Sequence, residues 1–317
     1  MSQEQYIIRE LTRLTRLVEI AQDQKICDIK TMPGGLTNHN YKIILEDGFT
    51  IAARVPGEGT EEYIDRAAEK YNLTLMGTLG IAPQIYYYNT KTGAQLTEFI
   101  HAATMHPEDF QRDRVLLAKA AMLMKTYHES GLKQAGSFSP TDKIRSYGHI
   151  LNDSGFICDF PHEERLRQQL HLAEEALVAA PFPTVPCHND PLSENFMYDG
   201  DKLTMIDWEF AGMNDCFFDL AAFIVENRLD DETADAFLTC YCGHEPTEKE
   251  RARLLLNRFL LDSFVFFWSL MQLNAGKDPG IYRPYAEERL FRALNYTEVP
   301  FFTQALDIVR ANADDTK

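Results

Sequence analysis

The residues best suited to chemistry form a polar segment at 188–195, HNDPLSEN, followed by IDWE at 206–209. The first segment has the pattern H-x-D-x-x-x-x-N. Transfer of a phosphoryl group to a hydroxyl needs an aspartate that accepts the hydroxyl proton and hard oxygen ligands that hold Mg²⁺. Asp190 would accept the proton, while Asn195 and Asp207 would bind the metal. The alternative is a turn rich in Asn and Asp, but the three spacings together favour a phosphoryl-transfer site.

The elements around these residues must bring them together. Apolar residues bracket both segments, which predicts two short strands flanking a loop between residues 184 and 210. A tight loop would then put Asp190 and Asn195 on one side, and Asp207 would end the strand that runs alongside. Three oxygen-bearing side chains would converge where Mg²⁺ and a γ-phosphate must lie.

Two further segments could bind phosphate. Gly34 and Gly35 allow a close backbone approach, and exposed N–H groups together with Thr37 and Asn38 could donate to phosphate oxygens. Arg54 lies among apolar residues on an expected strand, where it needs an anionic partner and could grip phosphate in a bidentate way. The alternatives are an ordinary hairpin turn and a solvated arginine on an edge strand.

The formal net charge of the 317-residue chain is -17. That charge argues against nucleic acid or an anionic membrane as the main partner, because both call for basic patches. It suits a small cationic substrate and divalent metal ions. The plainer explanation is that an acidic surface keeps the protein soluble.

The six cysteines form no C-x-x-C pair and no Cys/His cluster with typical zinc-site spacing, which favours a reducing, cytoplasmic setting. The N-terminal segment is polar and amphipathic, unlike a signal peptide. The most apolar run, residues 264–271, is too short to span a bilayer, so we expect no membrane insertion.

Hydrophobic periodicity divides the chain into two parts near residues 98–102. Residues 1–99 are expected to form a small α+β nucleotide-binding lobe, with helices at 2–22 and 61–79 and strands within 26–45 and at 49–55, 84–88 and 95–100. Residues 100–317 are expected to form a mainly helical catalytic and substrate-binding lobe, with helices at 108–129, 162–180, 217–227, 231–242, 247–273 and 285–296.

The motif HNDxxxxN followed by IDWE resembles the choline/ethanolamine kinase family, within the larger superfamily of aminoglycoside phosphotransferases. The resemblance extends to GGLTNHNY at 34–41, to DRAAEKYNLTL at 65–75 and to residues 207–226, so it runs from about 30 to about 295. It implies a protein-kinase-like two-lobed α+β fold, ATP and Mg²⁺ as cofactors, and phosphorylation of a small amino alcohol, with choline as the first expectation.

The resemblance also assigns roles in the nucleotide half. Gly35, Thr37 and Asn38 belong to the nucleotide loop. Arg54 takes the place of the phosphate-gripping kinase lysine, with Glu69 on the next helix as its ion-pair partner. The Glu98 carbonyl and the Ile100 N–H would bind adenine at the hinge. Asp219 would brace the catalytic loop, although by chemistry alone it could equally cap a helix.

On the substrate side, a quaternary ammonium needs aromatic faces and a carboxylate. By resemblance Glu226 is that carboxylate, and Trp268, Tyr285 and Phe210 line the pocket. Choline kinases usually carry two tryptophans three residues apart on this helix, and here the first position is Val265. Trp268 could also be a plain core residue of an apolar helix.

Other functions stay open at this point. Val265 makes a smaller amine such as ethanolamine an alternative acceptor, and an aminoglycoside, a sugar or a hydroxyl amino acid are others. A non-catalytic nucleotide-binding regulator is a third kind of protein, disfavoured because Asp190, Asn195 and Asp207 are all present. The sequence does not predict the oligomeric state.

Overall fold

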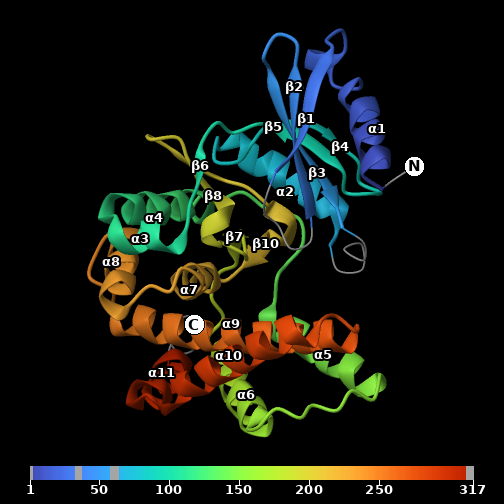
Figure 1. The fold of residues 1–317 in the computed structure, drawn as a ribbon. Helices are drawn as coiled ribbons and strands as arrows, with labels where there is room; N and C mark the ends of the chain where they lie inside the picture. Colours follow the sequence, from blue (N-terminus) through green and yellow to red (C-terminus); the bar gives the residue numbers. More distant parts are fainter. Residues whose placement is uncertain (1–2, 33–37, 58–63, 312–317) are drawn as a thin grey trace.

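The computed structural model describes residues 3–32, 38–57 and 64–311 and shows two lobes (Figure 1). In the first lobe, helices α1 (Gln3–Thr15) and α2 (Arg66–Thr78) accompany an antiparallel sheet of order β1-β2-β3-β5-β4. Its strands are β1 (Ile26–Met32), β2 (Asn38–Leu45), β3 (Thr50–Pro56), β4 (Ile85–Tyr88) and β5 (Gln95–Glu98).

In the central part of the sheet, β2 alternates between buried and more exposed side chains, the pattern of a strand with one face on a core. The apolar face of the sheet packs against α1, so that Leu11 and Leu14 join Tyr41, Ile43 and Leu96 in one buried cluster. The register pairs Arg54 with Gln95. This pairing therefore fixes the position of Arg54, the single arginine of β3, in the sheet.

The chain leaves this lobe at the end of β5 and crosses through residues 99–102 (Figure 1). The short strand β6 (Ala103–Thr104) pairs with β8 (Phe196–Tyr198), which also pairs with β9 (Leu203–Met205). A separate pair joins β7 (Val185–Cys187) to β10 (Gly212–Asn214). These small ladders carry the segments predicted to bind metal.

The second lobe is otherwise helical. Its α-helices are α3 (Pro107–Arg112), α4 (Arg114–His128), α5 (Pro140–Asp153), α6 (Glu163–Ala179), α7 (Cys216–Glu226), α8 (Asp231–Cys242), α9 (Glu248–Asn274), α10 (Pro279–Glu298) and α11 (Pro300–Ala311). Short 3₁₀ turns occur at Glu19–Ala21, Ser193–Asn195 and Trp208–Phe210.

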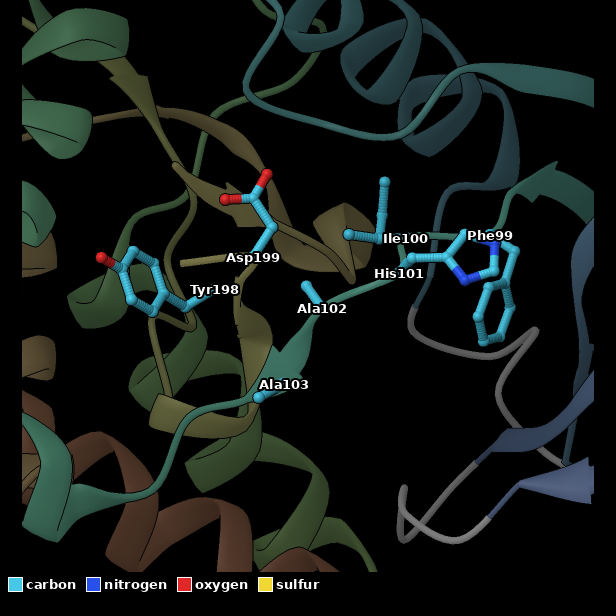
Figure 2. A pocket seen from close by; sticks show the side chains of 7 residues that line it. All are labelled: Phe99, Ile100, His101, Ala102, Ala103, Tyr198 and Asp199. Atoms are coloured by element: carbon cyan, nitrogen blue, oxygen red, sulfur yellow. The ribbon is translucent and has the colours of Figure 1, made fainter. Parts of the chain in front are cut away.

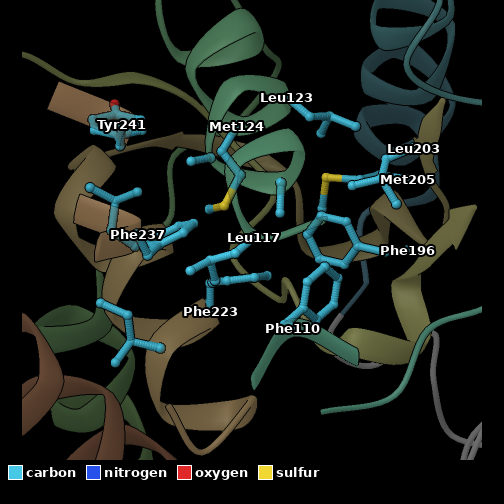
Figure 3. Close-up of a cluster of buried hydrophobic side chains, with 14 of the residues drawn as sticks. Phe110, Leu117, Leu123, Met124, Phe196, Leu203, Met205, Phe223, Phe237 and Tyr241 are labelled. Carbon is cyan, nitrogen blue, oxygen red and sulfur yellow. The ribbon is translucent and has the colours of Figure 1, made fainter. Parts of the chain in front are cut away.

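A cluster of aromatic side chains anchors the catalytic segment to this lobe (Figure 3). Phe196, the residue after Asn195, packs edge-on against Phe110 and Phe223, with ring centroids 5.4 and 5.5 Å away. Phe196 is fully buried, and burial of such a side chain stabilises the fold by roughly 1.5–3 kcal/mol. The position of Asn195 is therefore set by core packing.

Helix α9 is the centre of the helical part and packs against α5, α6, α7, α10 and α11. By length and composition alone it could cross a membrane, and it is the one such helix among the described residues. Within its most apolar window, 67% of the surface is buried inside the protein. That burial is typical of the core helix of a globular domain.

The structure confirms most of the predicted elements and corrects several. The first helix ends at Thr15 because Val18 adopts an extended backbone. The predicted helix at 108–129 is broken at Asp113, which is extended and caps α4 by accepting from the N–H groups of Val115 and Leu116. Helices α5 and α11 were not predicted, and α10 begins earlier than expected, with Pro284 inside it.

Candidate active site

The catalytic loop follows β7 and begins with a strained residue. Asn189 has a φ of 66°, in the left-handed region that a non-glycine residue rarely adopts. Its amide donates to the Phe210 carbonyl (3.0 Å) and its Oδ1 accepts from Asn214 (2.8 Å). These two hydrogen bonds fix the backbone conformation of the loop directly before Asp190.

Asp219 braces this loop, as the resemblance implied; the cap of α7 is Asp215 instead. Its carboxylate is fully buried and accepts from the backbone N–H groups of His188 (2.8 Å) and Asn189 (2.6 Å) and from the Tyr127 hydroxyl (2.9 Å). Burial opposes ionisation of Asp219, but the hydrogen bond and charge of His128 and the neighbouring His188 hold its pKa below the ordinary value.

Asn195 and Asp207 lie on adjacent segments, because the Ile206 N–H donates to the Asn195 carbonyl (2.9 Å). The Asn195 amide nitrogen donates to the Asp190 carbonyl (2.8 Å), and its Oδ1 accepts no hydrogen bond within the described part of the chain. Asp207 has a φ of 62°, and its side chain is 32% exposed. The Asn195 oxygen is therefore available to a cation, and the Asp207 carboxylate is accessible but shared with Arg54.

Asp190 lies among other acidic groups. Burial raises the pKa of Asp190 well above its ordinary value, and the charges of Asp207, Glu226 and Glu209 raise it further. A carboxylate held in this way is a stronger base than a free one. The expected metal ligand Asp207 and the expected amine ligand Glu226 therefore both act on the charge state of Asp190.

Arg54 is buried at the centre of an ionic network. Its guanidinium pairs with Glu69 and with Asp207 (Nη1–Oδ1 2.5 Å), and it lies 3.6 Å from Glu209. The Gln95 amide oxygen accepts from Arg54 Nε (2.8 Å) and Nη2 (3.1 Å). The predicted Arg54–Glu69 pair is thus present, and Arg54 also reaches the residue expected to bind metal.

Two residues of this network were missed by the sequence reasoning. Arg66 donates to Glu69 (2.8 Å) and lies 3.7 Å from Glu209. Burial raises the pKa of Glu209, with a further contribution from the Asp207 charge. Asn38, expected to face phosphate, instead donates to Glu209 (3.3 Å). Glu209 is the last residue of the IDWE segment. Its position two residues after Asp207 was the sequence signal that could have placed it in this network.

The expected adenine site lies at the connection between the lobes. An open pocket of about 590 Å³ is lined by residues 99–103 and by Tyr198 and Asp199 (Figure 2). Glu98 ends β5, and no backbone hydrogen bond engages the Ile100 N–H among the described residues. The pocket therefore borders the segment expected to bind a nucleobase. Gly35 and Thr37 of the expected nucleotide loop lie outside the described residues.

The expected amine carboxylate already has a cationic partner inside the protein. Glu226, the last residue of α7, accepts from Arg289 Nη1 and Nη2 at 2.7 Å each. Arg289 also donates to Asp262 (2.9 Å), which is fully buried and bonded to Arg292 (2.6 Å). Sequence reasoning missed Arg289, because its partner Glu226 is 63 residues away in the chain.

Tyr285 and Trp268 form an aromatic wall beside this pair. The Tyr285 hydroxyl accepts from Arg289 (2.5 Å), and the guanidinium carbon lies 4.7 Å from the centre of the Tyr285 ring. Trp268 meets Tyr285 and Tyr282 edge-on, at 6.5 and 5.8 Å between ring centroids. Burial raises the pKa of Tyr285 to about 12; the charge of Arg289 opposes this rise, and the charges of Glu226 and Asp190 add to it.

The α9 side chains differ in exposure, which distinguishes those that face the aromatic wall from those that belong to the core. Phe266, Phe267 and Leu270 are fully buried, whereas Trp268 and Val265 are partly exposed. Val265 and Phe210 pack against the same small cluster, formed by Phe138, Phe218, Ala222, Val225 and Leu261. The position that lacks a tryptophan therefore shares its packing cluster with Phe210, another of the expected pocket residues.

Comparison with known proteins agrees with this geometry. The family model described as choline/ethanolamine kinase matches residues 29–262. Protein LicA of Haemophilus influenzae is 28% identical over 272 residues, covering 84% of this chain and 78% of the relative. Ethanolamine kinase 2 of Mus musculus is 29% identical over 306 residues, covering 88% of this chain and 78% of the relative.

Solved structures show the same fold. A choline/ethanolamine kinase family protein from Mesorhizobium loti superposes with a TM-score of 0.85 and 27% identity, over 96% of this chain and 99% of that one. LicA in complex with AMP gives a TM-score of 0.75 and 25% identity, over 93% and 100% of the two chains. An aminoglycoside phosphotransferase in complex with GDP, only 14% identical, shares the fold with a TM-score of 0.63 over 94% and 99%. The protein-kinase-like two-lobed fold predicted from the sequence is confirmed.

Proposed function

The chain belongs to the choline/ethanolamine kinase family, and from that premise we propose that it transfers the γ-phosphate of ATP to the hydroxyl of choline. Members of this family are kinases that act on the alcohol group of a small amine. The choice of acceptor, the metal ion and the role of each residue are parts of the proposal.

The observation that carries the proposal is that helix α7 joins the catalytic loop to the aromatic wall. Near its start, Asp219 accepts from the N–H of Asn189, the residue before Asp190, and at its end Glu226 is bonded to Arg289, which also donates to Tyr285. A cationic head bound at Trp268 and Tyr285 would leave a hydroxyl two carbons away beside Asp190. A kinase for amino alcohols needs this juxtaposition of base and cation site.

In the proposed reaction Asp190 accepts a hydrogen bond from the choline hydroxyl and takes its proton as the oxygen bonds to the γ-phosphorus. The bond between that phosphorus and the bridging oxygen breaks, and ADP leaves with the electron pair. Arg54 orients the phosphates from the floor of the nucleotide lobe. Most of the rate enhancement then comes from positioning and from charge complementarity.

Asn195 and Asp207 would hold Mg²⁺. Their chemistry fits, because an amide oxygen without a hydrogen-bond partner and a partly exposed carboxylate are the hard oxygen donors that Mg²⁺ prefers. When bound, the ion neutralises charge on the phosphate oxygens. The ion pair between Arg54 and Asp207 must loosen for Asp207 to serve, which frees the guanidinium for phosphate.

The hydrogen bonds that Arg289 already makes to the groups around the aromatic wall favour choline over ethanolamine. A primary ammonium needs three acceptors, whereas a quaternary ammonium needs only aromatic faces and negative potential. Both Glu226 oxygens and the Tyr285 hydroxyl already accept from Arg289. The aromatic faces remain, which suits a head group that donates no hydrogen bonds.

Ethanolamine is the second candidate, and Val265 favours it. With valine at position 265, the pocket has one aromatic face fewer than two tryptophans would provide. The cation–π attraction for a quaternary head is correspondingly smaller, by roughly 0.5–2 kcal/mol. This free-energy difference corresponds to roughly a tenfold preference for one amine over the other. Competition between the two amines is therefore the informative measurement.

The test is an ADP-release assay in which choline, ethanolamine, a hydroxyl amino acid, a sugar and an aminoglycoside compete as acceptors. We expect the highest kcat/KM with choline and the next highest with ethanolamine. Turnover only with an unrelated acceptor would overturn the proposal, and nucleotide binding with no turnover would favour a regulator.

All six cysteines are free thiols, which supports a reducing compartment such as the cytoplasm.

A further inference from the structure

Three side chains of metal-binding type, none of them among the expected active-site residues, gather where α8 meets α9. Cys242 is the last residue of α8, His244 follows the left-handed turn at Gly243, and Glu250 lies in the first turn of α9. One ligand-type atom from each of the three lies within 4.8 Å of the other two. The spacing Cys-x-His with a glutamate six residues on is not typical of zinc motifs, so the sequence alone did not mark it.

The second ring nitrogen of the histidine faces the cluster. His244 Nδ1 lies 2.9 Å from the Glu245 carbonyl oxygen, and a carbonyl can only accept, so Nδ1 donates to it. Nε2 lies 3.7 Å from Glu250 Oε1. Metal-bound histidines are commonly oriented in this way, by a backbone carbonyl that fixes the tautomer.

The glutamate is oriented as well. Its Oε2 accepts from the backbone N–H (2.7 Å) and the hydroxyl (2.8 Å) of Thr247, which caps α9. These bonds hold the carboxylate so that Oε1 faces His244. The nearby guanidinium of Arg251 is engaged by Asp235 and Glu245, so it does not occupy the space between the three ligands.

A second cluster of the same composition makes a useful contrast. His128, Cys187 and Asp219 also bring their ligand atoms together. Both ring nitrogens of His128 are in hydrogen bonds, to Tyr241 and to Asp219, and Asp219 accepts three further bonds. Within the described part of the chain, the histidine of that buried cluster has no free ring nitrogen for a metal, and its aspartate serves the catalytic loop.

We propose that Cys242, His244 and Glu250 bind one Zn²⁺, or a divalent ion of similar preference, with water at the fourth position. One sulfur, one nitrogen and one oxygen donor suit zinc, whereas Mg²⁺ prefers oxygen alone. Zinc bonds of roughly 2.0–2.3 Å need donors about 3.5 Å apart, which small side-chain rotations provide. The 54% exposure of the His244 side chain leaves room for the water.

Binding converts the Cys242 thiol to a thiolate. The S–H bond breaks, the sulfur keeps the electron pair and donates it to the metal, and the proton passes to the solvent. The bound ion would tie the C-terminal end of α8 to the first turn of α9. None of the three residues belongs to the catalytic or amine-binding groups, so the expected effect is on stability rather than on turnover.

The test uses full-length protein stripped with a chelator, with Mg²⁺ in excess to fill the oxygen site. Co²⁺ should bind one equivalent per chain and give a thiolate-to-cobalt charge-transfer band, which a site made of Asn195 and Asp207 cannot give. Zn²⁺ should abolish the band and raise the Tm by a few degrees. Absence of the band in the unmodified protein would overturn the proposal.

Variants assign the ligands. Cys242→Ser and His244→Ala should lose the band or weaken metal binding roughly 100-fold, with an unchanged Tm in the absence of metal. Cys240→Ser, a partly buried cysteine two residues earlier on α8, is the matched control and should keep both effects. A band that survives Cys242→Ser would overturn the assignment. Glu250 is left intact, because it also belongs to the α9 cap.

Discussion

Arg289 holds Glu226 by both oxygens, with each guanidinium nitrogen 2.7 Å from one of them. The side chain of Arg289 is only 4% exposed, and it also pairs with the buried Asp262. A carboxylate held in this way has a fixed orientation and a compensated charge. We therefore expect Glu226 to act on a bound cation through its position beside the aromatic wall rather than as an isolated counter-ion.

Replacing Arg289 by lysine tests this relationship. Lysine keeps the charge but cannot make the bidentate contact, and each lost hydrogen bond to a charged group is worth about 1.5–3 kcal/mol. We expect the KM for the amine to rise about tenfold or more, with kcat changed less than about threefold and the KM for ATP unchanged. Steady-state kinetics with each substrate varied in turn will measure this.

Arg283→Lys is the matched control on the same helix, because its partner Asp159 is exposed. A surface pair contributes little, so that variant should keep both KM values. If Arg289→Lys lowered only the Tm and left the KM for the amine as it was, Arg289 would be a structural residue alone.

Asp190→Asn should reduce kcat by about 10²–10⁴-fold, because the proton acceptor is lost. The dissociation constant of ATP should change less than about twofold. The Tm should stay the same or rise, since burial and the neighbouring acids disfavour the charged form of Asp190 in the folded protein. Calorimetry and nucleotide titration check both points, and near-normal turnover in the folded variant would remove Asp190 from its role.

Trp268→Ala and Phe267→Ala are neighbours on α9 with opposite expected outcomes. Trp268 is partly exposed at the wall, so its loss should raise the KM for the amine alone. Phe267 is fully buried, so its loss should cost about 3–5 kcal/mol of stability. Chemical unfolding and kinetics on both variants separate the roles. A Trp268→Ala enzyme that is only less stable would show that Trp268 is core.

Asp219→Asn should make the protein less stable in a pH-dependent way. The folded pKa of Asp219 lies below its ordinary value of 3.8, so its charge stabilises the folded state above that pH. That contribution disappears as the pH falls through the folded pKa. We expect a loss of roughly 3 kcal/mol at pH 7 and a smaller difference from the unmodified protein near pH 3.

Urea unfolding at several pH values will measure the effect. Asp199→Asn, in an exposed turn, is the control and should show a much smaller change. A difference for Asp219→Asn that stayed constant from pH 7 to pH 3 would mean that the side chain acts by shape and not by charge.

Arg54→Lys should raise the KM for ATP about tenfold while leaving the KM for the amine unchanged. A lysine cannot serve Glu69, Asp207 and the Gln95 amide at once, so phosphates would be positioned less well. The measurement is again the pair of KM values. An equal change in both would mean that the substitution disturbs the lobe as a whole.

The phosphate half of the site could be predicted from the sequence because its chemistry is local. Asp190, Asn195 and Asp207 lie within 18 positions of one another, on one loop and the adjacent strand. The family and the two-lobed fold followed from the same motifs and are confirmed. Glu209 was missed, although it closes the motif, because only the structure shows it facing Arg54 and Arg66.

The amine half could be predicted only in outline. The pairing of Arg289 with Glu226 joins two helices that are distant in the chain, and no local pattern reports such a contact. Helix α5 was missed for a related reason. Its sequence includes Gly148 and Asn152, which have weak helix propensity, and its packing against α9 supplies what propensity does not.

The two faces of helix α9 differ in how well they are expected to tolerate substitution. Its inward face carries Asp262, Phe266 and Phe267, where a substitution endangers folding. Its other face carries the partly exposed Val265 and Trp268, where we expect a substitution to change the amine pocket more than the fold. Acceptor preference can therefore drift in evolution by single substitutions on one side of a helix, while the opposite side keeps the enzyme folded. Directed evolution toward new amino alcohols should begin at positions 265 and 268.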